Sequence, residues 1–185
     1  DINKTLKSLA ANPVFIRISV SFAMLSMIGY AMAFWLAPIM LRNFDVSLGE
    51  VGLYLGLTYI AAGVPAPLIG GFLTDYMAKR DARWRAWIPA IAIIIATVAL
   101  WFCVMADSLQ AFLSYFVLAY FVFMIPQAAS LSLLLSSLGA GERAVGASFA
   151  LIINSLMGAG LGPLLVGMLS DAMAADYGVK SLNYA

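Results

Sequence analysis

Long stretches without a charged residue alternate with short charged segments along this chain. Five stretches reach the roughly 20 residues that a helix needs to cross a bilayer core of about 30 Å. These charge-free stretches are residues 18–41, 51–74, 86–106, 108–141 and 144–170, and all charged residues lie between or outside them. We interpret the fourth stretch as one long helix that ends before Gly139-Ala140-Gly141. The pattern predicts transmembrane helices at about residues 14–41, 48–75, 86–106, 108–138 and 144–170.

The composition agrees with this pattern and excludes a soluble domain. Of the 185 residues, 64% are hydrophobic and 10% are charged, whereas a soluble domain has about 25% charged residues. The net charge of +1 gives no bulk electrostatic attraction to nucleic acid. We therefore expect an all-α integral membrane protein whose surroundings are the lipid bilayer.

The residue types that carry most catalytic and metal chemistry are scarce. Histidine is absent, the single cysteine, Cys103, lies in an apolar stretch, and no carboxylate lies inside any of the five stretches. A lone serine or tyrosine would have no visible base. We predict no enzyme, no catalytic residue, no metal site and no cofactor.

The basic residues lie unevenly on the two sides of the predicted membrane. Cytoplasmic segments of membrane proteins carry the excess of lysine and arginine. With the N-terminus of this chain inside, eight of the ten basic residues are cytoplasmic, and only Arg42 and Lys180 are external. We predict a cytoplasmic N-terminus and an external C-terminus.

The second and fifth stretches end in similar sequences. Residues 67–75 (PLIGGFLTD) and 163–171 (PLLVGMLSD) are identical at five of nine positions. Three crossings separate the copies, so they point in opposite directions, and inverted repeats of this kind are typical of secondary transporters. The repeat predicts two three-helix units, of which the second lacks its last helix. The absence of an initial methionine also leads us to expect a piece of a longer or processed chain.

Residues 71–80 (GFLTDYMAKR) resemble the loop signature of the major facilitator superfamily, Gly-x-Leu-x-Asp-x-x-Gly-Arg-Arg/Lys. The match holds at Gly71, Leu73, Asp75, Lys79 and Arg80. The sequence departs from the signature at Ala78, where glycine is usual, and at Tyr76, where arginine is frequent.

A second motif and several shorter segments extend the resemblance over essentially the whole chain. Gly158, Gly162, Pro163 and Gly167 are similar to the Gly-x-x-x-Gly-Pro-x-x-Gly helix of the superfamily, with one extra residue before the last glycine. The first stretch, the turn at residues 141–146 and the end at residues 181–185 look like the C-terminal half of Spinster-like members.

This resemblance implies the fold and the parts of a gate. It implies five transmembrane helices of a six-helix bundle, helices seven to eleven of twelve, with the N-terminal half and the last helix absent. Asp75 would meet the N-terminus of a neighbouring helix beside Lys79 and Arg80 and hold the inner gate shut. Arg143 looks like the reciprocal contact for the missing half; simple anchoring at the inner face is the alternative.

Weakly polar and aromatic side chains recur at helical spacing inside the predicted spans. Gln127 and Asn154 stand out, because an amide in hydrocarbon needs hydrogen-bond partners. Such side chains either join helices or line an aromatic, weakly polar cavity that suits an amphiphile. The candidate substrate-binding residues are Tyr30, Phe34, Tyr54, Thr58, Tyr120, Gln127 and Asn154.

The leading interpretation is half of a secondary active transporter that works by alternating access on a lipid-like or amphiphilic molecule, with possible coupling to protons through the missing half. The resemblance places it in a plasma membrane or a bacterial inner membrane. The alternative is a self-sufficient oligomeric channel or scaffold subunit, against which the odd number of spans and the incomplete repeat argue.

Overall fold

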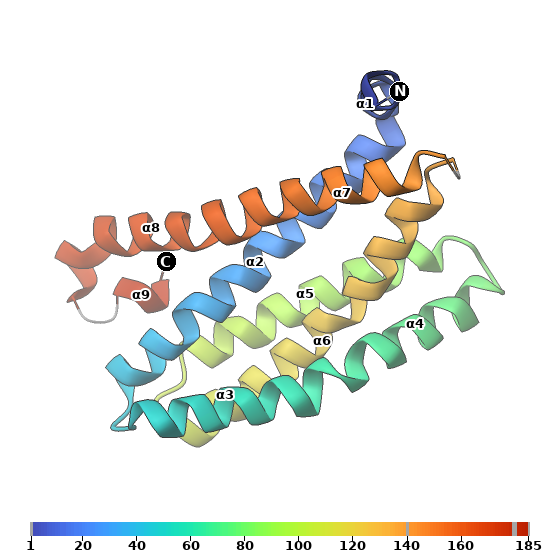
Figure 1. The fold of residues 1–185 in the computed structure, drawn as a ribbon. Helices are drawn as coiled ribbons and strands as arrows, with labels where there is room; N and C mark the ends of the chain where they lie inside the picture. The colour runs from blue at the N-terminus through green and yellow to red at the C-terminus, as the bar shows by residue number, and fades with distance from the viewer. Residues whose placement is uncertain (1, 140, 179–180, 185) are drawn as a thin grey trace. The chain divides into compact units, whose positions relative to one another are not determined.

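The computed structural model describes residues 2–139, 141–178 and 181–184, and the regular elements there are helices (Figure 1). Nine are α-helical and one, η1, is a π-helix. They are α1 (Ile2–Ala11), α2 (Pro13–Asn43), α3 (Leu48–Gly63), α4 (Pro65–Ala78), α5 (Trp84–Val104), α6 (Leu109–Ser136), α7 (Arg143–Asn154), η1 (Ser155–Leu161), α8 (Gly162–Tyr177) and α9 (Ser181–Tyr184).

Five helical stretches in the described part of the chain are long and apolar enough to cross a membrane, as the sequence predicts. We number them spans one to five: Pro13–Asn43, Leu48–Ala78, Trp84–Val104, Leu109–Ser136 and Arg143–Tyr177. Most ends agree with the prediction within three residues. Span five ends seven residues beyond its predicted end at residue 170, because α8 continues through the polar residues Asp171 and Asp176 to Tyr177.

The contacts divide the chain into two compact units. Unit 1 contains residues 1–36 and 130–185, and unit 2 contains residues 37–129. Unit 1 therefore joins the first span to the fifth, whereas unit 2 is one continuous stretch of chain.

Spans two and five are each interrupted at a corresponding place. In span two the helix divides at Val64, because Pro65 has no N–H to donate to the carbonyl of the preceding turn. In span five the π-helix η1 precedes Pro163, in the first turn of α8. The sequence predicts one helix for each span and does not predict the π-helical segment.

The repeated sequence also repeats its burial. At eight of the nine aligned positions, the two copies have the same degree of exposure. Thr74 and Ser170 are both buried, for example, and Asp75 and Asp171 are both exposed. The exception pairs Gly70 with Val166: Gly70 is buried because it lies against the backbone of Ile125.

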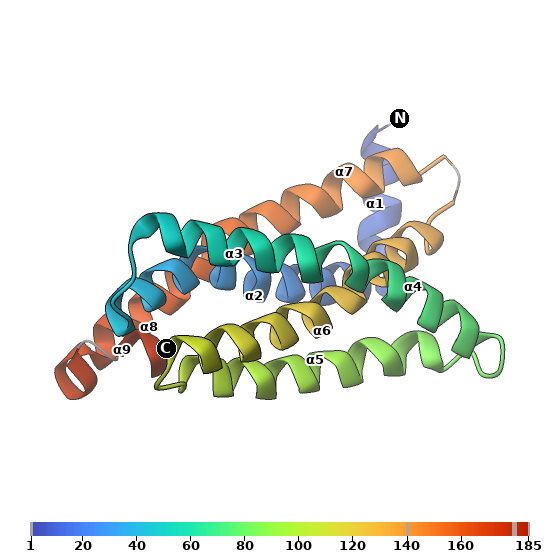
Figure 2. The ribbon, with the colours of Figure 1, turned by 90° about the horizontal axis from the view of Figure 1, so that it is seen from below.

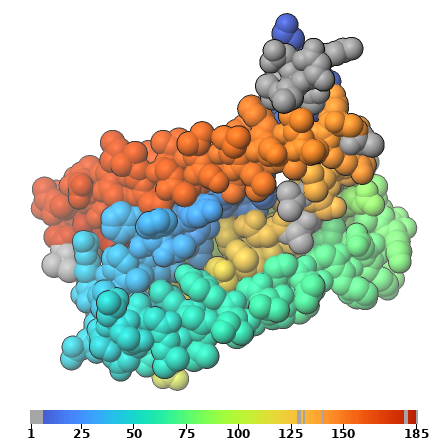
Figure 3. Space-filling model, viewed as in Figure 1, coloured from blue at the N-terminus to red at the C-terminus, as the bar shows by residue number. Residues whose placement is uncertain are grey.

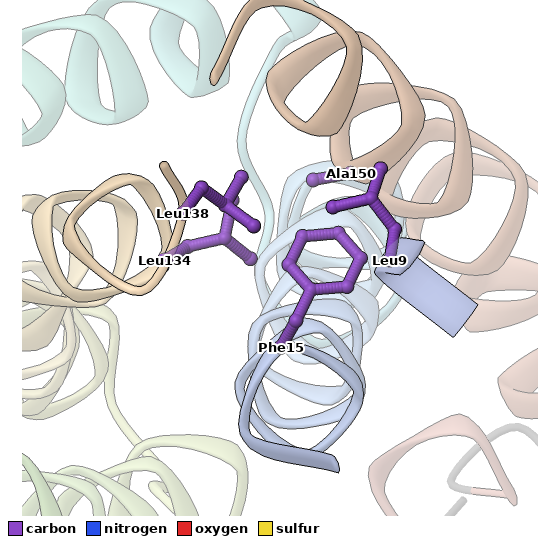
Figure 4. Close-up of a cluster of buried hydrophobic side chains, with 5 residues drawn as sticks. All are labelled: Leu9, Phe15, Leu134, Leu138 and Ala150. Atoms are coloured by element: carbon purple, nitrogen blue, oxygen red, sulfur yellow. The ribbon is translucent and has the colours of Figure 1, made fainter. Parts of the chain in front are cut away.

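The short helix α1 was not predicted from the sequence. It contacts α7, and its Leu9 lies in a buried cluster with Phe15, Leu134, Leu138 and Ala150. Figure 4 shows these side chains pointing toward one another from α1, α2, α6 and α7, with Leu138 in the turn that follows α6. Asn12 separates α1 from α2 and caps α2, since its side-chain oxygen accepts hydrogen bonds from the N–H groups of Val14 and Phe15.

Candidate functional site

Within unit 1, a polar contact joins the middle of span one to the middle of span five. The Ser26 hydroxyl donates a hydrogen bond to the side-chain oxygen of Asn154. Its oxygen is also 2.9 Å from the carbonyl oxygen of Phe22, one turn earlier on the same helix. Asn154 is thus held at the last residue of α7, where the π-helix begins.

Glycines bring the two spans into close contact just beyond this bond. A Cβ atom on Gly158 would lie 2.6 Å from the Tyr30 ring, and one on Gly162 would lie 2.6 Å from the Met27 carbonyl oxygen. A side chain at Gly162 would require the backbone of span one to move. Small residues permit this kind of helix approach in membranes.

A tryptophan of span one binds the backbone of span five further along. The indole Nε1–H of Trp35 donates a hydrogen bond of 2.9 Å to the carbonyl oxygen of Pro163, and the same ring lies against Gly167. Ser26 and Asn154 are 128 residues apart, and so are Trp35 and Pro163. The constant separation means that the two helices run in the same direction with one fixed register.

The π-helix η1 lies between these two hydrogen bonds. It spans seven residues, Ser155–Leu161, and includes Gly158 and Gly160. Short π-helical segments within α-helices are rare and frequently occur at functional sites. Here the irregular turn is fixed to span one before it, through Asn154, and after it, through Pro163.

The exposed side chains of this region are mostly apolar. Tyr30 and Phe34 of span one are exposed, at four-residue spacing. In Figure 3 the side chains of span five, in orange and red, are accessible along its length. The exposed large apolar residues of span five include Leu151, Ile152, Leu156, Leu164, Leu165 and Met168.

Within unit 2, aromatic rings form the corresponding feature. Tyr120 of α6 lies 4.9 Å from the ring of Tyr59 and 5.7 Å from that of Phe116, measured between centroids. A Cβ on Gly63 would lie 3.2 Å from the Tyr120 ring. Tyr120 is therefore wedged between spans two and four, and both tyrosines remain partly accessible.

The other predicted lining residues of unit 2 differ in their accessibility. Thr58 is buried and donates a hydrogen bond of 2.9 Å to the carbonyl oxygen of Tyr54, whose side chain is partly exposed. Gln127 is partly exposed on span four. Their role in binding stays a prediction.

The loop signature lies at the end of span two. Nothing lies within 4 Å of a Cβ atom placed on Gly71, outside its own helix backbone, and Leu73, Asp75, Lys79 and Arg80 are exposed. Arg80 donates a hydrogen bond of 3.2 Å to the Tyr76 hydroxyl. Among the residues that the structure describes, the Asp75 carboxylate forms no hydrogen bond or ion pair. Arg80 thus contacts Tyr76, and the gate role of Asp75, Lys79 and Arg80 stays a prediction.

Arg143 begins span five and is exposed. Its Nε–H donates a long hydrogen bond, 3.4 Å, to the carbonyl oxygen of Leu138 at the end of the preceding turn. This contact uses one donor of the guanidinium group, which has five.

The sequence pattern does not single out several contact residues, among them Met27, Trp35 and Tyr59. Met27 contributes a backbone atom, which no sequence pattern reveals. Trp35 and Tyr59 could have been found from their amphipathic rings within apolar spans, because a buried indole N–H or phenol needs a partner. No group of three or more potential metal ligands occurs in the described ranges.

Comparisons with known proteins agree with this architecture. The chain is 30% identical over 181 residues to an MFS-type efflux pump of Mycolicibacterium smegmatis, and the match covers 96% of this chain and 41% of that protein. A solved bacterial homologue of the human lysosomal transporter Spinster, inward-facing and unoccupied, matches 93% of the chain with a TM-score of 0.81 and 27% identity. Over nearly its whole length the chain is therefore similar to a transporter of the major facilitator superfamily.

Further comparison supports the Spinster-like branch. The occupied inward-facing structure of the bacterial Spinster homologue matches 91% of the chain with a TM-score of 0.77 and 28% identity. The chain spans about two fifths of the length of these superfamily members, 41% of the pump and 36% of each solved chain. No family model matches the chain. Because the matching proteins are transporters, the comparison also agrees with the prediction that the chain is not an enzyme.

Proposed function

We propose that this chain is the C-terminal transmembrane bundle of a secondary active transporter that works by alternating access. The observation that carries the proposal is the interrupted span five, fixed to span one on both sides of its π-helix, in a chain whose fold matches transporter structures over nearly its whole length. In this proposal the spans are helices seven to eleven of twelve, and the partner is an N-terminal six-helix half of the same transporter.

The π-helix gives span five a place to bend during the transport cycle. Irregular helix turns interrupt the regular hydrogen-bond ladder, so a change of helix direction concentrates there. The bonds at Asn154 and Pro163 hold both sides of the turn to span one. Spans one and five would then move together as one element of a rocking bundle.

The short helix α9 supports the proposal of a sixth span. It packs against α8, with Ser181 Oγ 3.1 Å from Ser170 Oγ and the rings of Tyr177 and Tyr184 4.4 Å apart. The repeat offset of 96 residues aligns Ser181 with Arg85, the second residue of α5. We infer that α9 is the first turn of a span equivalent to span three.

The substrate class that fits the accessible side chains is an amphiphilic, lipid-like small molecule. Tyr30 and Phe34 present exposed rings, and Tyr54, Tyr120, Gln127 and Asn154 add polar atoms on otherwise apolar spans. We retain these residues and Thr58 as the proposed contacts. One relative is described as an efflux pump, and another is a bacterial homologue of a lysosomal transporter.

The proposal also assigns the orientation of the chain in the membrane and the kind of membrane that holds it. The basic residues favour a cytoplasmic N-terminus and an external C-terminus for this chain, in a plasma or bacterial inner membrane. The five spans carry no lysine, arginine, aspartate or glutamate in their central parts. If protons drive transport, their carboxylate carrier lies in the other half.

The first test is the intact mass of the native polypeptide. A mass of about twice 19.8 kDa or more fits a transporter of two bundles. A mass near 19.8 kDa would contradict the half-transporter proposal and favour the self-sufficient channel or scaffold subunit.

The second test is flux into liposomes that contain the full-length protein. We expect saturable uptake of a fluorescent lysolipid, and slower uptake when Asn154 is replaced by leucine. Uptake that stays linear with concentration would indicate a channel. Saturable uptake of a hydrophilic sugar instead of the lysolipid would contradict the substrate class and leave the transport mechanism standing.

A further inference from the structure

The connection between spans two and three carries a dense basic segment, which we call the basic loop and define as residues 79–85. Its four basic residues, Lys79, Arg80, Arg83 and Arg85, are all exposed. The acidic residue of the loop, Asp81, is engaged locally, because its carboxylate accepts a hydrogen bond of 2.9 Å from the backbone N–H of Arg83. The loop therefore presents a net positive surface.

The basic loop necessarily lies at a membrane face. It joins the ends of two apolar helices, α4 and α5, which contact each other (Figure 2). Clusters of four or more lysines and arginines next to a transmembrane helix attract anionic lipid headgroups. The attraction rests on the proposed orientation, which puts the loop on the cytoplasmic side, where anionic lipids concentrate.

On α4, an exposed aromatic face leads from the apolar region to the loop. The rings of Phe72 and Tyr76 are stacked, with centroids 6.3 Å apart and an interplanar angle of 13°. The Arg80 guanidinium lies 5.4 Å from the centroid of the Tyr76 ring and donates to its hydroxyl. Phe72 is 75% exposed, so this face offers an apolar surface below a fixed positive charge.

On α5, two tryptophans complete the surface. The rings of Trp84 and Trp87 lie 6.0 Å apart, and Trp87 is 57% exposed. Tryptophans concentrate at the depth of lipid headgroups, because their rings are apolar and their N–H groups are polar. The aromatic residues on both helices thus sit beside the charges that would bind a phosphate.

We propose that the basic loop and these aromatic faces bind an anionic phospholipid. Arg80, Arg83 and Arg85 bind the phosphate group, and Phe72 and Trp87 contact the acyl chains. The occupant is a lipid and not a soluble anion, because the aromatic surfaces adjoining the charges are too apolar to favour water. Tyr76 is a positioning residue, since its ring and hydroxyl fix the direction of Arg80.

The test uses the full-length protein in detergent, titrated with phosphatidylglycerol or phosphatidylcholine while thermal unfolding is followed. We expect a rise in Tm with phosphatidylglycerol that exceeds the rise with phosphatidylcholine and decreases with added salt. The double variant R83Q/R85Q should bind phosphatidylglycerol about fivefold more weakly for each arginine removed. Arg42→Gln, a basic residue at the end of α2, is the matched control and should leave the affinity unchanged.

Three results would overturn the proposal: equal stabilisation by the two lipids, full retention of phosphatidylglycerol by R83Q/R85Q, or the same stabilisation by inorganic phosphate alone. Native mass spectrometry of the retained lipid provides a readout that is independent of transport. Should the double variant fail to fold, Tyr76→Phe removes only the hydroxyl contact to Arg80. This milder variant should weaken phosphatidylglycerol retention, and unchanged retention would likewise contradict the assignment.

Discussion

Ser26 and Asn154 form a side-chain hydrogen bond across 128 residues of sequence, at the point where span five changes from α-helix to π-helix. The bond pairs a hydroxyl on span one with an amide on span five. Together with the Trp35–Pro163 bond, it fixes the register of two parallel helices.

Replacing Asn154 by leucine should lower the free energy of unfolding by about 1 kcal/mol, since hydrogen bonds between membrane helices contribute about 0.6 kcal/mol on average and at most about 1.7. Ser148→Ala is the control, because the Ser148 hydroxyl donates only to the Ala144 carbonyl of its own helix. Unfolding in mixed micelles measures the free energy of unfolding of both variants. Equal losses in the two variants would show that the contact between spans one and five adds nothing to stability.

Gly162→Ala should destabilise the protein by about 1–3 kcal/mol, because the added methyl group overpacks the contact with span one. Its Cβ would lie 2.6 Å from the Met27 carbonyl oxygen. Gly160→Ala provides the comparison, since nothing lies within 4 Å of a Cβ at that position. Thermal unfolding should give a lower Tm for Gly162→Ala than for Gly160→Ala. An unchanged Tm in Gly162→Ala would mean that spans one and five are not in close contact.

Leu9→Ala should release α1 from α7. Leu9 is 2% exposed and packs in the buried cluster of unit 1, and truncation of such a leucine costs about 2–5 kcal/mol. Hydrogen exchange of the α1 amides should increase in this variant. Val14→Ala, at an exposed position of the next helix, should leave their exchange unchanged. Protection of α1 that survives Leu9→Ala would exclude this docking contact.

Asp75→Asn should impair transport by the full-length protein, if the carboxylate meets a helix N-terminus of the other half. Loss of an interaction of about 1–2 kcal/mol shifts a gate equilibrium roughly tenfold. Asp171→Asn is the matched control, because it occupies the equivalent repeat position with the same exposure. Unaltered uptake by liposomes that contain the Asp75→Asn variant would contradict the assignment of Asp75 to the gate.

Cys103 should resist alkylation until the protein unfolds. Its side chain is buried, and its Sγ lies 3.4 Å from the carbonyl oxygen of Phe112. A membrane-permeant maleimide should therefore label the denatured protein much faster than the native one. Rapid labelling of the native protein would show that spans three and four separate at this position.

The number of spans could be predicted from the sequence, since the cost of placing charges in hydrocarbon keeps charged residues out of the central part of each span. The repeat could be predicted as well, from nine aligned residues. The π-helix could not be predicted from the sequence, because it depends on how Gly158 and Gly162 pack against Tyr30 and Met27. Helix α1 was missed because it is too short for a span, although its Leu9 packs in the core.

The candidate site was predicted in part. Asn154 was singled out as an amide in need of a partner, and the structure gives it Ser26. The partner of Arg80 was not foreseen, because the family signature draws attention to Asp75, whereas Tyr76 one residue further along provides the contact. Spacing along one helix predicts which side chains share a face; contacts between helices require the fold.

The discontinuous composition of unit 1 determines the order in which the protein can assemble during synthesis. Residues 37–129 can make their contacts as soon as span four has been produced, whereas the hydrogen bonds from span one to span five must wait until span five follows. Throughout that interval the Ser26 hydroxyl can donate to the Phe22 carbonyl of its own helix. Ser26 of span one can therefore stay in the bilayer without an unsatisfied hydroxyl and transfer its hydrogen bond to Asn154 when span five is inserted.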